Sequence, residues 1–371
     1  YAGFSHADIA PLVSLDDGYY LLELFHGPTL AFKDVAMQLL ARLMDDALRR
    51  RGQRATIVGA TSGDTGGAAI EAFRGRDAVD VFILYPQGRV SDIQRMQMTT
   101  PTDANVHTLA VDGTFDDCQA LVKAMFNDSE FRQEVNLAGV NSINWARVMA
   151  QTTYYFTAAA QLGSPDTPVG FSVPTGNFGD IFAGYVAAQM GLPVARLMIA
   201  TNVNDILARV MQAGIYETEE VIATSSPSMD IQVSSNFERL LFELTRRDAP
   251  RVSGFMDALA RDGRFEMAED EVALMSALFD AARVDEAQTQ ETMRDVLKRF
   301  DIQIDPHTAV GLAAARRAVL PDGVPMVTLA TAHPAKFPAA VEAAFGTGPD
   351  IPARVREMMT QPERISPVEN A

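Results

Sequence analysis

The sequence has little that suits a secreted, membrane-spanning or disulfide-stabilised protein. It contains one cysteine, Cys118, so no disulfide can form within the chain and a reducing compartment is indicated. Its apolar stretches, such as residues 183–200, are interrupted by polar residues or proline, and none is long enough to span a bilayer. The first ten residues lack the basic and apolar regions of a signal peptide. A cytoplasmic protein with no membrane partner is therefore predicted.

Basic residues and candidate metal ligands are also few. The 31 Lys and Arg residues are outnumbered by 48 Asp and Glu, and the formal net charge is −17. Because binding to a phosphate backbone needs a basic stripe, no nucleic-acid partner is expected. The five histidines are scattered without metal-ligand spacing, and the chain has neither a G-x-S-x-G turn nor a second cysteine. Zinc, Ser-His-Asp and dithiol chemistry have no support, and no metal is predicted.

Short apolar or β-branched segments alternate with helical stretches along much of the chain. The segments with the pattern of buried strands are residues 56–58, 81–85, 106–111, 169–173, 194–199 and 326–329. Such strands, separated by helices, predict an α/β fold with a mainly parallel sheet covered on both faces. Residues 236–300 carry many charges and few strand signals, so they are expected to be helical.

Domain boundaries are weakly marked in the sequence. The length allows two or three domains, and two series of strands and helices cover residues 34–147 and 148–200. We interpret them as the halves of an enzyme with a cleft, the later segments returning to the second half. The predicted domains are a small one at 34–147 and a large one comprising 1–33 and 148–371.

The segment H-G-P-T-L-A-F-K-D, residues 26–34, ends beside a predicted helix. Gly27 and Pro28 indicate a turn, and the apolar residues after Lys33 keep three- and four-residue spacing. The N-terminal end of a helix repels cations, so Lys33, held beside Phe32, could have a lowered pKa and act as an amine nucleophile. Taken alone, the segment is more simply explained by a solvated lysine.

Two loops rich in glycine follow predicted strands and precede predicted helices. They are A-T-S-G-D-T-G-G at residues 60–67 and P-T-G-N-F-G-D at 174–180. Backbone N–H groups at a helix N-terminus bind anions, and open α/β sheets bind ligands at the carboxyl ends of strands. Either loop alone could be an ordinary turn with a helix cap, but the pair suits a ligand with two separated anionic groups.

Two further segments carry polar groups beside predicted elements. N-S-I-N-W-A-R, residues 141–147, offers amide, hydroxyl and guanidinium donors where a helix begins. Arginine suits bidentate recognition of phosphate, although a capped helix with a surface arginine explains the same residues. T-A-H-P-A-K-F, residues 331–337, follows the strand ending at Leu329, and its histidine is interpreted as structural.

Taken together and in this order, these segments resemble the threonine synthases, in the β-family (fold type II) of pyridoxal-phosphate enzymes. Residues 26–34 are similar to the family's Schiff-base lysine segment, 60–66 to its substrate-carboxylate loop, and 176–180 to its cofactor-phosphate cup. Residues 331–337 resemble the segment at the pyridine nitrogen, and 226–239 also look like this family, although their spacing indicates no chemistry. The resemblance runs from about residue 14 to 345. It implies two open, mainly parallel sheets flanked by helices, with a cleft between a small domain and a large cofactor-binding domain.

The resemblance also implies a role for each matching residue. Lys33 would form the Schiff base with pyridoxal 5′-phosphate and then shuttle protons. The implied cofactor contacts are Gly176, Asn177, Phe178 and Gly179 at the phosphate with Asp180 beside them, Thr331 at the pyridine nitrogen, and Asp64 at the 3′-oxygen. The implied substrate contacts are Thr61, Ser62, Gly63 and Thr65 for the carboxylate, and Asn141, Ser142 and Arg147 for the phosphate of O-phospho-L-homoserine. The implied reaction removes that phosphate and adds water, giving L-threonine.

Two features depart from the family pattern. An N-terminal domain that relatives normally carry is expected to be absent here. Many fold type II enzymes have asparagine where Asp64 stands, and an ionised aspartate would repel the cofactor's phenolate unless its pKa is raised or its partner differs. Two other functions are considered: a threonine or serine dehydratase, which would need no substrate-phosphate site, and a silent ligand-binding relative, which would need no amine at residue 33. A monomer or homodimer is expected.

Overall fold

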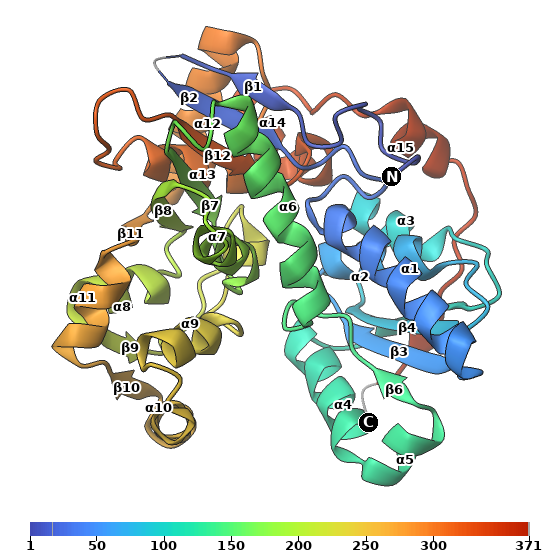
Figure 1. Cartoon of the computed structure of the whole chain (residues 1–371). Coiled ribbons are helices and arrows are strands. Elements are labelled where there is room, and N and C mark those ends of the chain that lie inside the picture. The colour runs from blue at the N-terminus through green and yellow to red at the C-terminus, as the bar shows by residue number, and fades with distance from the viewer. Residues whose placement is uncertain (17, 370–371) are drawn as a thin grey trace. The chain divides into compact units, whose positions relative to one another are not determined.

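The computed structural model describes residues 1–16 and 18–369 and contains two compact units. The first unit comprises residues 1–9, 25–150 and 349–371, and the second comprises 10–24 and 151–348. Each unit has its own sheet, wholly parallel in the first unit and mainly parallel in the second (Figure 1). The sequence-based boundaries placed Lys33 and the C-terminal residues in the larger domain, whereas the observed contacts group both with the first unit.

The first unit is built on a five-stranded parallel sheet in the order β13-β5-β4-β3-β6. Its strands are β3 (Ala55–Ala60), β4 (Val79–Pro86), β5 (Val106–Val111), β6 (Leu137–Ala138) and β13 (Ser366–Val368). Its helices are α1 (Lys33–Arg51), α2 (Asp64–Phe73), α3 (Asp92–Thr99), α4 (Phe115–Asn127), α5 (Ser129–Glu134) and α15 (Ala353–Met358). The boundary between the units falls within α6 (Trp145–Gln161).

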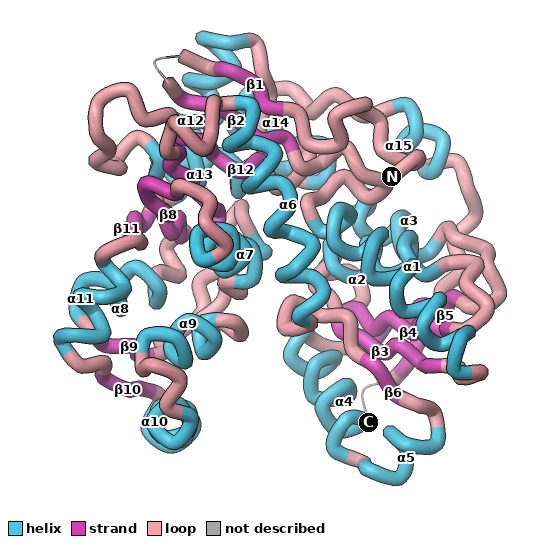
Figure 2. The backbone as a smooth tube through the Cα atoms, viewed as in Figure 1, coloured by secondary structure: helices cyan, strands magenta, loops and turns pink. Residues whose placement is uncertain are grey.

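Helices pack on both faces of this sheet, which explains why its central strands are mostly apolar. Successive strand residues point to opposite faces. Ile57 and Ile83 belong to a core cluster with residues of α1 and α2, whereas Val58 and Leu84 cluster with α4 around Cys118. Figure 2 shows the helices on the two sides of β3 and β4. The carboxyl ends of β3 and β4 therefore lead into loops set between well-packed layers.

The second unit contains a six-stranded sheet in the order β1-β2-β12-β7-β8-β11, in which only β1 is antiparallel to its neighbour. Its strands are β1 (Leu12–Ser14), β2 (Tyr19–Glu23), β7 (Val169–Pro174), β8 (Val194–Thr201), β11 (Phe279–Arg283) and β12 (Met326–Ala330). A separate antiparallel pair joins β9 (Ile215–Glu217) and β10 (Arg264–Glu266). The helices are α7 (Gly179–Gln189), α8 (Ile206–Ala213), η1 (Pro227–Met229), α9 (Phe237–Leu244), α10 (Ala249–Asp262), α11 (Glu269–Ser276), α12 (Glu286–Phe300), α13 (Pro306–Ala315), η2 (Pro334–Lys336) and α14 (Pro338–Phe345).

Helices cover this second sheet closely enough that one contact requires glycine. Leu21 and Met326 of the sheet share a core cluster with Val296 of α12 and Leu312 of α13. Next to β8, a Cβ on Gly184 of α7 would lie 2.7 Å from the Tyr155 ring and 3.0 Å from Leu197. A glycine there lets the α7 backbone approach the sheet. The helix that begins at the β7 loop is thus packed closely against α6 and β8.

All six predicted strands are present, but the prediction that residues 236–300 are helical is wrong in part. That segment contains β10 and β11. Phe279-Asp280-Ala281-Ala282-Arg283 has few residues that favour strands, and its parallel pairing with β8 at the sheet edge is what makes it a strand. No helix in the described part of the chain is long and apolar enough to cross a membrane.

Candidate active site

Lys33 is the first residue of α1, as the sequence predicts, and its side chain is buried. It is 11% exposed, and Nζ lies 4.7 Å from the centroid of the Phe32 ring and 3.5 Å from Oδ2 of Asp64. The preceding residue, Phe32, provides no side-chain cap to the helix. A solvated surface lysine is therefore the wrong interpretation, and Nζ is held by a carboxylate and an aromatic ring.

The turn before Lys33 is fixed by a buried aspartate. Asp34 is 0% exposed, and it accepts hydrogen bonds of 2.7 Å from both the backbone N–H and the hydroxyl of Thr29. Leu30 has a positive φ of 61°. A Cβ on Gly27 would lie 2.3 Å from Cβ of Asp34, so only glycine fits there. These contacts set the direction in which the chain enters α1, and hence the position of Lys33.

Asp64 is the first residue of α2, and Gln94 orients it. Nε2 of Gln94 donates a 2.9 Å hydrogen bond to Oδ1 of Asp64, which leaves Oδ2 facing Lys33. Gly63, with φ of 141°, makes room for this amide, because a Cβ there would lie 2.4 Å from Cδ of Gln94. Gln94 also completes a capping box with Ser91 at the start of α3. The S-x-x-Q pattern at residues 91–94 could have predicted the cap, but not that the amide reaches Asp64.

The loop at residues 60–65 uses one predicted ligand to hold its own backbone. Oγ1 of Thr61 accepts hydrogen bonds of 2.9 Å from the N–H groups of Gly63 and Gly66. Ser62 is exposed and Thr65 is half-buried. Thr61 therefore shapes the turn at the start of α2, and Ser62 and Thr65 are the hydroxyls that remain more exposed than that of Thr61.

Arg147 is buried within the first unit. It is 3% exposed, and its Nη1 donates to the carbonyl of Val140 at 3.3 Å. Asn144 caps the helix start by accepting from the N–H of Ala146 at 3.0 Å. Asn141 is exposed and Ser142 is half-buried. The capped helix is present, but the interpretation of Arg147 as a surface residue is wrong.

The loop between β7 and α7, in the second unit, has the geometry of a phosphate cradle. Phe178 has a positive φ of 62°, and a Cβ on Gly176 would lie 2.6 Å from the carbonyl oxygen of Ser228. The backbone N–H groups of Gly176, Asn177 and Phe178 donate to no residue that the structure describes. Three such N–H groups just before a helix N-terminus form an anion site, so these residues fit a bound phosphate.

The segment 226–239, which gave no chemistry from its spacing, holds the carbonyl groups of this cradle. Ser234 donates to the Gly176 carbonyl at 2.8 Å. The backbone and side-chain N–H groups of Asn236 both donate to the Asn177 carbonyl, at 3.1 and 2.9 Å. With the carbonyls fixed from one side, the N–H groups are left for a ligand.

His307 supports the same cradle through Ser228. Its Nε2 accepts from the N–H of Ser228 at 3.2 Å, so its Nδ1 carries the proton and donates to Asp305 at 2.7 Å. Asp305 is also the N-cap of α13. Because the Ser228 carbonyl lies against Gly176, this pair fixes one wall of the loop. No motif in the sequence connects residues 228 and 307.

Asp180 and Thr331 complete the predicted set in the second unit. The hydroxyl of Tyr154 donates to Oδ1 of Asp180, and that of Tyr155 donates to its carbonyl at 2.9 Å. Burial raises the pKa of Tyr155 well above its usual value, with the Asp180 carboxylate acting in the same direction, so the phenol stays protonated. Thr331 directly follows β12 and is 6% exposed.

The predicted residues are divided between the two units. Lys33, Asp64, the 61–65 loop and residues 141–147 belong to the first unit, and residues 176–180 and Thr331 belong to the second. The expectation that Lys33 lies between the two loops concerns both units and stays a prediction. Among described residues, no group of three or more His, Cys, Asp or Glu is placed to hold a metal ion.

Comparison with known proteins identifies the class to which this site belongs. Residues 8–332 match the family model described as pyridoxal-phosphate dependent enzyme, and residues 308–371 match the C-terminal model of threonine synthase. The chain is 52% identical to a threonine synthase of Pseudomonas aeruginosa, covering 100% of this chain and 79% of that protein. It is 43% identical to the threonine synthase of Saccharomyces cerevisiae, covering 100% and 80%.

Solved structures indicate the same family as the sequence relatives. The crystal structure of PLP-bound threonine synthase from Brucella melitensis superposes with a TM-score of 0.97 at 57% identity, covering 100% of this chain and 80% of that one. The yeast threonine synthase structure gives 0.93 at 43% identity, with the same coverage. The chain therefore belongs to the pyridoxal-phosphate dependent enzymes of fold type II, and pyridoxal phosphate is its cofactor. Within that class it belongs to the threonine synthases, which are lyases.

Proposed function

We propose that this chain converts O-phospho-L-homoserine and water to L-threonine and phosphate. The observation that carries this choice of substrate is the burial of Arg147, 3% exposed, in the unit that also holds Lys33. A buried guanidinium at a helix start, with Ser142 nearby in sequence, suits a phosphate ester. A dehydratase acting on serine or threonine has no phosphate for such a group to bind.

The residues of both units fit the cofactor. Gly176, Asn177 and Phe178 would hold its phosphate with the N–H groups described above. The hydroxyl of Thr331 would hydrogen-bond its pyridine nitrogen, and Lys33 would bind it covalently. When bound, the cofactor supplies an electron sink that stabilises negative charge developing on the substrate carbons.

Lys33 would move the protons that this reaction requires. Its Nζ would take the proton from Cα of the substrate and return one later, as a single base and acid. Asp64, 3.5 Å away, holds Nζ in place, and the hydrogen bond from Gln94 keeps Asp64 from rotating. Two side chains therefore position the lysine in series: Asp64 contacts Nζ, and Gln94 holds Asp64. Neither of them has to contact the substrate.

Two sets of residues in the first unit would bind the two anionic groups of the substrate, its carboxylate and its phosphate. The start of α2, with the hydroxyls of Ser62 and Thr65, would hold the carboxylate, because N–H groups and the helix dipole favour an anion there. Arg147, Asn141 and Ser142 would hold the phosphate. A guanidinium there offsets the charge of the phosphate as it leaves, which favours elimination over simple binding.

Replacing Arg147 tests the choice of substrate. In Arg147→Ala, we expect kcat/KM for O-phospho-L-homoserine to fall roughly 150-fold, the equivalent of about 3 kcal/mol for a hydrogen bond to a charged group. Binding of L-serine and L-threonine, measured by absorption changes of the loaded enzyme, should remain. Arg132→Ala, which removes an exposed arginine of the same unit, is the control. Equal activity of Arg147→Ala and wild type would rule out this substrate site.

Location and assembly are further proposals. The single buried cysteine supports a reducing, cytoplasmic compartment. A monomeric or homodimeric state stays a prediction.

A further inference from the structure

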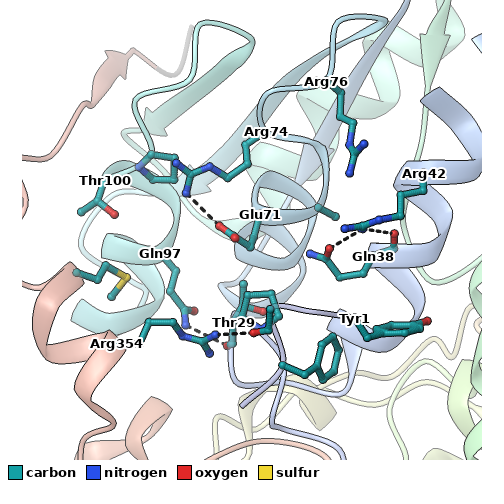
Figure 3. A pocket seen from close by; sticks show the side chains of 16 residues that line it. Tyr1, Thr29, Gln38, Arg42, Glu71, Arg74, Arg76, Gln97, Thr100 and Arg354 are labelled. Atoms are coloured by element: carbon teal, nitrogen blue, oxygen red, sulfur yellow. Dashed lines mark hydrogen bonds and ion pairs between the residues drawn. The ribbon is translucent and has the colours of Figure 1, made fainter. Parts of the chain in front are cut away.

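The first unit contains a cavity of about 490 Å³, lined by residues near the N-terminus and by α1, α2, α3 and α15 (Figure 3). Four arginines line it, namely Arg42, Arg74, Arg76 and Arg354, and Glu71 is the one acidic residue among the lining side chains. In a chain with a formal net charge of −17, this concentration of guanidinium groups is unusual. None of these residues belongs to the site proposed above.

Among described residues, only one of the four arginines has a carboxylate oxygen within hydrogen-bond distance. Arg74 pairs with Glu71 at 3.2 Å and with Asp103 at 2.7 Å. Arg42 donates to the carbonyl and side-chain oxygens of Gln38, at 2.7 and 2.8 Å, and pairs with no carboxylate in the described chain. Arg76 comes only within 4.0 Å of Asp45, and its Nε is buried without a hydrogen-bond partner among described residues.

Arg354 is the fourth arginine, and its partners are carbonyl groups. Its guanidinium donates to the Gly3 carbonyl at 3.2 Å and the Gly27 carbonyl at 2.6 Å, with no ion pair in the described part of the chain. Partial burial lowers the pKa of Arg354, against the opposing effects of Asp34 and Glu71. An anion beside this group would offset the cost of its desolvation.

A buried acceptor atom in the cavity wall indicates that the ligand also carries a hydrogen-bond donor. Gln97 is 7% exposed, and its Nε2 donates to the Thr29 carbonyl at 3.0 Å. Its Oε1 is buried and accepts no hydrogen bond from any residue described in the structure. An unsatisfied buried oxygen is costly, and a ligand hydroxyl or amine would satisfy it.

We propose that this cavity is a binding site for a small organic anion that carries a phosphate or carboxylate group together with a hydroxyl or amine. Arg42, Arg76 and Arg354 hold the acidic group, and Gln97 accepts from the donor group. The volume is that of a site for a small molecule rather than a macromolecule.

The same side chains connect the cavity to the turn before Lys33. Arg354 holds the Gly27 carbonyl, and Gln97 holds the Thr29 carbonyl. Thr29 in turn holds Asp34, which neighbours Lys33. A ligand that orders Arg354 and Gln97 therefore also orders the turn that positions the lysine, and this site is regulatory rather than catalytic.

Calorimetric titration of the full chain loaded with cofactor tests the site. The probes are glycerol 3-phosphate, inorganic phosphate, malate and glycerol. We expect glycerol 3-phosphate or malate to bind, phosphate to bind more weakly than glycerol 3-phosphate, and glycerol not to bind. The comparison of glycerol 3-phosphate with malate separates phosphate from carboxylate ligands. Absence of binding by both of them would overturn the proposal.

The matched variants are Arg42→Ala and Arg51→Ala, which remove one exposed arginine each from the same helix. Arg42→Ala should weaken binding at least tenfold and Arg42→Lys less, while Arg51→Ala should leave it unchanged. Anions bound at the catalytic site would bind all three variants equally, so the difference reports the cavity alone, whatever the substrate of the enzyme. Equal affinity in Arg42→Ala and Arg51→Ala would overturn the site.

Hydrogen exchange tests the connection to Lys33. Ligand binding should slow exchange of the amides of residues 29–34 in wild type and in Arg51→Ala, but not in Arg42→Ala. Unchanged exchange in liganded wild type would contradict a regulatory role.

Discussion

Nζ of Lys33 lies 3.5 Å from Oδ2 of Asp64, and each residue is the first of its helix. An acidic side chain is favoured at the start of α2, whereas a lysine at the start of α1 is not. The ion pair offsets the unfavourable position of the lysine. The partners of this carboxylate include Lys33 and Gln94, and its contact with the cofactor's 3′-oxygen stays a prediction.

Asp64→Asn tests whether the carboxylate positions the lysine. Asparagine keeps the shape and can still accept from Gln94, but it removes the charge beside Nζ. We expect kcat to fall roughly 100-fold, at the lower end of what a positioned acid–base group contributes, with a smaller change in KM. Steady-state kinetics across pH, with Asp46→Asn as an exposed control on α1, give the comparison. A variant as active as wild type, with the same pH profile, would exclude this role.

Gln94→Leu tests the second link of the same chain of contacts. The variant loses the hydrogen bond to Asp64, so we expect kcat to fall about tenfold, the equivalent of roughly 1.4 kcal/mol. In an Asp64→Asn background the same substitution should cost much less, because the partner charge is already gone. Gln87→Leu, at an exposed glutamine, is the control. Additive effects of the two substitutions would show that Gln94 acts by another route.

Gly176→Ala tests the phosphate cradle. The added Cβ would lie 2.6 Å from a backbone oxygen of Ser228, which cannot move aside as a flexible side chain would. We expect the affinity for pyridoxal phosphate to fall more than tenfold, measured by spectroscopic titration of the apoenzyme. Gly254→Ala, in α10 with nothing within 4 Å of its Cβ, should be neutral or stabilising by about 0.5–1 kcal/mol. Unaltered cofactor affinity in Gly176→Ala would contradict the assignment.

Glu271 gives a prediction for the dependence of stability on pH. Its hydrogen bonds with Arg251 lower the pKa of Glu271 below its ordinary value of 4.5, and burial acts in the opposite direction. A lowered folded-state pKa means that the pair stabilises fully above pH 4.5 and is lost as the pH falls through the folded value. Glu271→Gln should therefore cost about 1 kcal/mol at pH 7, since Arg251 is 42% exposed, and progressively less below pH 4.5.

Urea unfolding at several pH values measures this effect. Gln retains an acceptor for the Ala268 N–H that Glu271 caps, so the comparison isolates the charge. Glu269→Gln, at an exposed position of the same helix, should show no such dependence. A difference between Glu271→Gln and wild type that grew on acidification would have the wrong sign.

The local pattern of the sequence predicted most of the buried strands and the loops of the candidate site. The buried strands of both sheets are mostly apolar, so their positions follow from composition, and glycines marked both loops that are predicted to bind anions. The position of β11 does not follow from its composition, because Asp280 and Arg283 are in a strand only through pairing with β8. The burial of Arg147 could not be read from its own helix, which is exposed on either side of it at Trp145 and Met149.

Contacts between residues that are far apart in the sequence could not be predicted, and the reason is the same for each. Gln94 reaches Asp64, Asn236 reaches Asn177, and His307 reaches Ser228, each through contacts that depend on tertiary packing. No spacing rule connects such positions. The resemblance marked residues 226–239 as characteristic of the family, and the structure supplies the physical reason, which is that they hold the carbonyl groups of the cradle.

The most direct test of the central claim is to map the lysine that carries the cofactor. Borohydride reduction of the loaded enzyme, followed by mass spectrometry of its peptides, identifies the modified residue. The chain has only four lysines, and Lys336 is the other buried one, at 0% exposure. We predict that the reduced cofactor is found on the peptide containing Lys33 and is lost in Lys33→Ala. Modification of Lys336, Lys123 or Lys298 in place of Lys33 would contradict the assignment.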